Sequence, residues 1–162
     1  MIFEWAEDLE LVRTVITHAR LYDAISDDFS PSREDYRPPV SPAIRYLLVR
    51  DGGEFLGLWM CVAHSEIVLE VHTCLLPRAW GRRAAIAARE CAEWLWRHTK
   101  AQRIITAAPS CNPLAIAFAK RAGMEQYGRN PRAYQKRGEL HDVVLLGISR
   151  PEKEEQSCQQ QH

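Results

Sequence analysis

The stretch Cys74-Leu-Leu-Pro-Arg-Ala-Trp-Gly-Arg-Arg-Ala-Ala85 joins a predicted strand to a predicted helix. Residues 66–76 alternate apolar and polar side chains, a period of two that favours a strand. Pro77 lacks a backbone N–H and ends that strand. Apolar residues then recur at helical spacing as far as about Thr99. The first N–H groups of a helix have no intrahelical acceptor, so this junction is a candidate anion-binding turn.

A second stretch, Ser110-Cys-Asn-Pro-Leu-Ala-Ile-Ala-Phe-Ala-Lys-Arg-Ala-Gly-Met124, contains the start and stop signals of a helix. Asn112 is a predicted N-cap, Pro113 suits the first helical position, and Gly123 lies just past the end. The short apolar run before it, residues 103–108, predicts a buried strand. Strands therefore alternate with helices in this half of the chain.

The N-terminal part predicts one helix over residues 8–25, a loop with four prolines over 29–42, and then a hairpin. The hairpin strands cover residues 44–49 and 54–63 around Asp51-Gly52-Gly53. At the other end, residues 126–134 and 141–148 predict two strands joined around Arg137-Gly138-Glu139.

This element order predicts an α/β fold, with a mixed central sheet of about six to seven strands flanked by helices. We expect a single domain over residues 1–150. Residues 151–162 are rich in Glu, Lys and Gln and predict a disordered tail. Ligands of such sheets bind at the carboxyl ends of strands, often against a helix N-terminus.

Composition narrows the class of protein. A chain of 162 residues with 46% hydrophobic and 26% charged residues is an ordinary globular domain. It shows neither an apolar run long enough for a membrane span nor a secretory signal, so we expect a cytoplasmic protein with no membrane partner. The five cysteines are odd in number and irregularly spaced, which favours free thiols.

A metal site is not expected. The one candidate set of zinc ligands is Cys61, His64, His72 and Cys74, of which His72 and Cys74 would share a strand face. Structural zinc sites use tighter ligand pairs than these.

The net charge of zero hides two basic stretches, residues 78–103 and 120–137, both dominated by arginine. The planar guanidinium fork suits phosphate, which favours a polyphosphate ligand over a merely solvated surface. Nucleic acid is an alternative partner, although no recognised nucleic-acid motif supports it.

Both quoted stretches resemble the GNAT (N-acetyltransferase) superfamily. The first is similar to the family's acyl-CoA loop, Gln/Arg-x-x-Gly-x-Gly/Ala. If Pro77 sets the register, Trp80, Arg83 and Ala85 occupy the three defined positions of this loop. If the loop instead begins at Arg78, Gly81 occupies the position of the middle glycine. The second resembles the Asn-x-x-Ala helix that leads to Gly-Phe. Residues 128–147 resemble the final hairpin of the ribosomal-protein N-terminal acetyltransferase branch, and of small acetyltransferase-like proteins of bacteriophages.

The resemblance implies acetyl-CoA as co-substrate and assigns residues to its binding. These are the strand end, the loop with the first helical turn, and the next helix: Cys74, Leu75, Leu76, Gly81, Arg82, Arg83, Ala84, Ala85, Asn112 and Phe118. The family often places a tyrosine seven residues after the asparagine, as general acid toward the thiolate. Here Ala119 stands in that position, with Tyr127, Tyr134 and Ser110 as substitutes that spacing does not support.

Glu70 and His72 lie on one face of the strand that flanks the acyl site in this family, so either is a candidate general base. The competing interpretation is structural: a hydrogen-bonded core histidine beside a carboxylate paired with arginine. We expect an acyl-CoA-dependent N-acyltransferase that acts on an unidentified amine in a ternary complex. The alternative is a non-catalytic GNAT-like binding module associated with nucleic acid or protein. A homodimer is compatible with the sequence.

Overall fold

The computed structural model describes residues 1–152, so the predicted tail lies almost entirely outside the described residues. One seven-stranded sheet has the order β1-β2-β3-β4-β5-β7-β6, and every neighbouring pair except β4–β5 is antiparallel. The mixed sheet of six to seven strands is thereby confirmed. The elements are β1 (Ile2–Trp5), α1 (Leu9–Ile16), α2 (Ala19–Ile25), β2 (Ile44–Asp51), β3 (Glu54–Ala63), β4 (Val68–Leu75), a 3₁₀ turn (Pro77–Ala79), α3 (Arg82–His98), β5 (Arg103–Pro109), α4 (Pro113–Arg121), β6 (Glu125–Lys136) and β7 (Glu139–Ser149).

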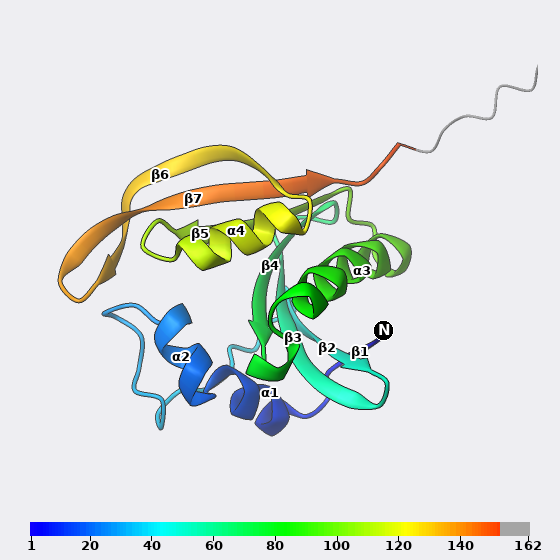
Figure 1. The fold of residues 1–162 in the computed structure, drawn as a ribbon, viewed down its shortest axis with the longest axis horizontal. Helices are drawn as coiled ribbons and strands as arrows, with labels where there is room; N and C mark the ends of the chain where they lie inside the picture. The colour runs from blue at the N-terminus through cyan, green and yellow to red at the C-terminus, as the bar shows by residue number, and fades with distance from the viewer. Residues whose placement is uncertain (153–162) are drawn as a thin grey trace, which may run out of the picture.

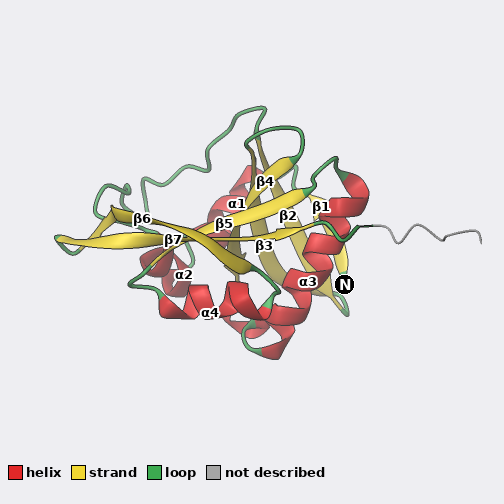
Figure 2. Cartoon of the chain, turned by 90° about the horizontal axis from the view of Figure 1, so that it is seen from above, coloured by secondary structure: helices red, strands yellow, loops and turns green. Residues whose placement is uncertain are grey.

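Helices cover both faces of the sheet (Figures 1 and 2). The α3 side chains Ala87, Cys91 and Leu95 pack on one face of β2–β4, while Val12 and Ile16 of α1 pack on the other. The α4 residue Ala119 packs against β5 and β7. Alternation along each strand sends successive side chains into these separate cores.

The two predicted hairpin turns are confirmed. Gly52 and Gly53 have φ of 58° and 83°, and Arg137 and Gly138 have 53° and 77°. Consecutive positive φ angles suit the twist of a two-residue hairpin. The tip of the β6–β7 hairpin, orange in Figure 1, reaches the end of α2, where Lys136 Nζ donates a 2.9 Å hydrogen bond to the carbonyl of Ser26.

The structure corrects two predictions near the N-terminus. The expected helix over residues 8–25 is two helices, because His18 leaves helical geometry with ψ of 132° and caps α2 through Nδ1. Thr17 accompanies this break by donating its hydroxyl to the carbonyl of Arg13 at 2.8 Å. Strand β1 was not predicted; its Phe3 and Trp5 pack against Trp94 of α3, at ring distances of 6.3 and 5.3 Å.

Among the described residues, Cys61, Cys74 and Cys91 are buried free thiols and Cys111 is an exposed one. Cys61 packs on the α3 face of the sheet and Cys74 on the α1 face, so these two candidate zinc ligands lie on opposite faces. Residues 1–152 contain no group of side chains arranged to hold a metal ion. None of their helices is long and apolar enough to span a membrane.

Candidate functional site

The sheet opens between β4 and β5. These strands pair only over Val68–Glu70 and Arg103–Ile105, after which β5 continues along β7. The hydroxyl of Thr106 donates to the carbonyl of Val71 at 2.8 Å across the start of this gap. Because alternate residues of a strand direct both backbone groups to the same side, the peptide groups of Thr73 also face the gap.

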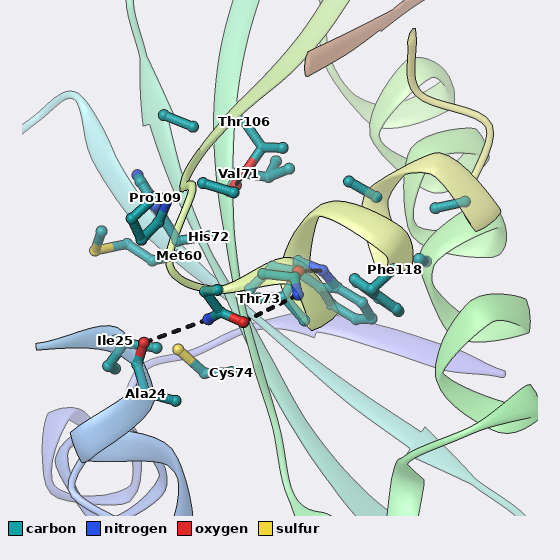
Figure 3. A pocket seen from close by; sticks show the side chains of 18 of the residues that line it. Ala24, Ile25, Met60, Val71, His72, Thr73, Cys74, Thr106, Pro109 and Phe118 are labelled. Atoms are coloured by element: carbon teal, nitrogen blue, oxygen red, sulfur yellow. Dashed lines mark hydrogen bonds between the residues drawn. The ribbon is translucent and has the colours of Figure 1, made fainter. Parts of the chain in front are cut away.

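A cavity of about 440 Å³ passes through the gap (Figure 3). We call its two sides the α3–α4 half and the α1–α2 half. The α3–α4 half is lined by small and apolar side chains, among them Ala88, Cys91, Leu95, Phe118 and Ala119. The α1–α2 half is lined by Ile16, Tyr22, Ile25, Tyr36, Met60 and Cys74. One continuous space therefore connects both faces of the sheet.

Four of the residues proposed from sequence meet in the wall of this cavity: His72, Cys74, Asn112 and Phe118. Asn112 is confirmed as the N-cap of α4, since its Oδ1 accepts a 3.1 Å hydrogen bond from the N–H of Ala115. Its Nδ2 also donates to the carbonyl of Ala24 at 3.4 Å, which ties α4 to α2. Burial raises the pKa of the Cys74 thiol to about 12, so this side chain is an uncharged part of the cavity wall.

Glu70 and His72 project from the same face of β4, as predicted, but only His72 lines the cavity. The Nε2 atom of His72 lies 3.3 Å from Oε1 of Glu70, and Nε2 of His64 lies 2.6 Å from Oε2. The hydrogen bond from His72 is the main cause that lowers the pKa of Glu70, and His64 adds to it. An ionised Glu70 that accepts from Nε2–H leaves Nδ1 of His72 as the ring's proton acceptor.

The start of α3 is an open helix N-terminus. Gly81 is the N-cap, with φ of 85°, and Arg82 begins the helix with an exposed side chain. The side chain of Arg83 is directed elsewhere, because Nε lies 3.0 Å from Oδ2 of Asp51 and Nη1 lies 2.5 Å from Oε2 of Glu54. Arg82 is thus exposed at the start of the helix and Arg83 is paired with the β2–β3 hairpin, while the assignment of both arginines to CoA stays a prediction.

The other residues that the sequence assigned to CoA binding differ in how deeply they are buried. Leu75, Leu76 and Ala84 are buried in the two cores, and Ala85 is half-buried in the first turn of α3. Leu75, Leu76 and Ala84 are outside the cavity wall as described, so only their backbone groups remain candidates for ligand contacts.

No protein-family model matches this chain, and no curated protein matches its sequence. Solved structures do match. Spermidine N-acetyltransferase from Vibrio cholerae, in complex with CoA and spermine, superposes with a TM-score of 0.72 at 15% identity, over 91% of this chain and 94% of that one. An acetyltransferase of the GNAT family from Streptococcus pneumoniae gives 0.67 at 16% identity, over 93% and 99%.

The chain has the GNAT fold. The resemblance seen in the sequence is thereby confirmed at the level of architecture, while the ribosomal-protein and bacteriophage branches stay predictions. Ala119, which stands at the position of the tyrosine expected from the resemblance, is buried and lines the α3–α4 half of the cavity.

Of the three substitutes considered for that tyrosine, only Tyr134 lies in the cavity wall of this GNAT fold. Its hydroxyl donates to the carbonyl of Ser26 at 2.7 Å, and burial raises its pKa. Tyr127 is half-exposed, with the guanidinium of Arg103 5.3 Å from its ring centre.

Sequence reasoning missed Tyr22, Tyr36 and Thr106 as cavity residues of this GNAT fold. Tyr36 lies in the proline-rich loop, where no periodicity assigns a side chain to the interior. Burial raises its pKa to about 12. Only tertiary contact, here an edge-to-face pair with Tyr22 at 5.6 Å, brings it to the cavity.

Proposed function

We propose that this protein transfers an acyl group, acetyl first among them, from a CoA thioester to an amine by direct attack in a ternary complex. The observation that carries the proposal is the cavity across the β4–β5 gap, which reaches both faces of the sheet and has His72 in its wall. Two substrates that enter from opposite faces of the sheet would meet there. Holding them in contact supplies much of the rate gain of such a transfer.

The residues present fit a CoA thioester. The peptide groups of Thr73 face the gap, where a pantetheine amide needs hydrogen-bond partners, and Phe118 offers an apolar wall. Cys74 and Asn112 would line the same passage. The N–H groups of the turn and first helical turn, residues 81–85, together with Arg82, would hold the diphosphate. When bound, CoA supplies the activated thioester.

His72 would take the proton of the attacking amine at Nδ1, and ionised Glu70 would position the ring through Nε2–H. This divides the two roles that the sequence left open: His72 is the catalytic base and Glu70 a positioning residue. The departing thiolate needs little acid assistance, and solvent would protonate it.

A non-catalytic CoA-binding module is the second candidate, favoured by Ala119 at the usual position of the acid. A nucleic-acid role gains little from the structure, because several residues of the basic stretches bond within the molecule: Arg83 to Asp51, Lys100 to Glu66 and Arg129 to Asp142.

Thiol release from acetyl-CoA, measured over a panel of amines, tests the proposal. His72→Ala should lower kcat by about 10²–10⁴-fold with an unchanged KM for acetyl-CoA. His64→Ala is the matched control, because His64 touches the same carboxylate but lies outside the cavity wall. Amine-dependent release that is equal in wild type and His72→Ala would exclude the base. CoA binding without release from any amine would favour the binding module.

A further inference from the structure

The α1–α2 half of the cavity has a wall without charged side chains. Among the described residues, the whole cavity is lined by no Asp, Glu, Lys or Arg, and His72 is its one basic group. The wall of the α1–α2 half includes aliphatic, thioether, thiol and phenol side chains together with two serines: Ile16, Ile25, Met60, Cys74, Tyr22, Tyr36, Ser26 and Ser30. A buried cation in such a place has no counter-charge to offset its desolvation.

Two carboxylates of the loop that follows α2 already accept hydrogen bonds. Asp27 accepts hydrogen bonds from the N–H of Phe29 and the hydroxyl of Ser30, at 3.0 and 2.8 Å. Asp28 accepts from the N–H groups of Arg137 and Gly138, at 2.6 and 2.8 Å.

Two further carboxylates close to this half are also paired. Asp23 lies 3.6 Å from the guanidinium of Arg137, and Glu70 is shared by two histidines. None of these four acids lines the cavity, and each already has a partner within the molecule.

Two of the three phenol hydroxyls in the cavity wall bond within the molecule. Tyr22 donates to the carbonyl of Pro31 at 2.7 Å, and Tyr134 donates to that of Ser26 at 2.7 Å. With these two hydroxyls engaged, the rings of Tyr22 and Tyr134 present mainly carbon to the cavity, which favours an apolar body.

We infer that the acceptor is a monoamine carried on an apolar body, and that polyamines are poor acceptors. This inference rests on the proposed function and specifies its second substrate. The one amine of such an acceptor would lie at His72, where it loses its proton, while its apolar body fills the α1–α2 half. A second ammonium in that half would be buried without a partner.

The test compares hexylamine with 1,6-diaminohexane, which have equal length and differ by one cation. Binding is measured by calorimetry in the presence of CoA, and transfer by thiol release from acetyl-CoA. Wild type should favour hexylamine by at least about tenfold in both. Ile25→Asp places a carboxylate at the exposed end of the cavity wall and should shrink that preference several-fold. Ile67→Asp, at an apolar residue that is also exposed but lies away from the wall, should retain it.

The outcomes separate this inference from the proposed function. Transfer to the diamine at an equal or higher rate in wild type overturns the inference and leaves an acyltransferase. Preferential binding of hexylamine without transfer supports the monoamine as the ligand of this half and overturns the transferase. Binding of neither amine overturns the inference, as does an Ile25→Asp preference equal to that of Ile67→Asp.

Discussion

Arg82 and Arg83 are neighbours in the sequence, yet their side chains have different partners. Arg83 bonds Asp51 and Glu54 of the β2–β3 hairpin, and these bonds raise its pKa above the ordinary value. Arg82 begins α3, where the helix dipole disfavours a cation unless an anion is bound. Arg83 thus supports the fold, and we propose that Arg82 contacts the ligand.

Arg82→Glu should weaken CoA binding by about tenfold, because a charge-assisted hydrogen bond contributes about 1.5–3 kcal/mol. It should leave the melting temperature of the ligand-free protein unchanged. Arg83→Glu should lower that melting temperature, because three carboxylates would then crowd the hairpin. Calorimetric titration and thermal unfolding of both variants check this pair. Equal loss of CoA affinity in the two would contradict the division of roles.

At the scale of elements, the backbones of β3 and β4 approach closely at Gly57. This residue has φ of 133°, and a Cβ added to it would meet the carbonyl of Cys74 and lie 2.8 Å from Cα of Leu75. The contact lies at the end of β4, next to the turn into α3. The same close approach therefore fixes where the candidate diphosphate turn begins.

Gly57→Ala should lower the free energy of unfolding by about 2–4 kcal/mol, from backbone strain and overpacking together. Gly52→Ala is the matched control, because Gly52 also has positive φ but has open space around it. That variant should lose only about 1 kcal/mol. Denaturant unfolding of both proteins measures the difference, and equal losses would show that the close approach is unimportant.

The β6–β7 hairpin is held to the α2 side by Asp28. Backbone hydrogen bonds from Gly138 and Arg137 lower the pKa of Asp28 below its usual 3.8. A lowered pKa means that the contact is complete above that value and is lost as pH falls through the folded value. The amide chemical shifts of Arg137 and Gly138 should therefore titrate below pH 3.8. In Asp28→Asn they should lose this titration, and an unchanged titration would assign it to another group.

Local signals in the sequence were enough for most elements. Asn112, Pro113 and Gly123 delimit α4, and Gly52 and Gly138 place the hairpin turns, because these residues have strong local preferences. The break at His18 and strand β1 depend on tertiary contacts with the sheet and with α3. The cavity follows the same division: His72 and Asn112 lie on regular elements, whereas Tyr36 reaches the wall from a loop without periodicity.

At the scale of the whole molecule, the site depends on the parting of β4 and β5. Strand pairing ends at Glu70 and Ile105, and helices from both faces line the resulting space. Several helices, strands and loops form this cavity together. Sequence motifs therefore identify some residues of its wall but not its shape. We propose that this space receives a CoA thioester from the α3–α4 side, and the function proposed above depends on this claim.

Calorimetric titration of acetyl-CoA into wild type, Ala88→Trp and Ile86→Trp tests that claim most directly. Ala88 lines the α3–α4 half of the cavity, whereas Ile86 lies on the exposed side of the same helix. Wild type and Ile86→Trp should bind one acetyl-CoA per chain, and Ala88→Trp, if folded by its circular dichroism, should bind at least about tenfold more weakly, because its indole fills the passage. No heat in wild type at millimolar acetyl-CoA, or equal affinity in all three folded proteins, would contradict the account.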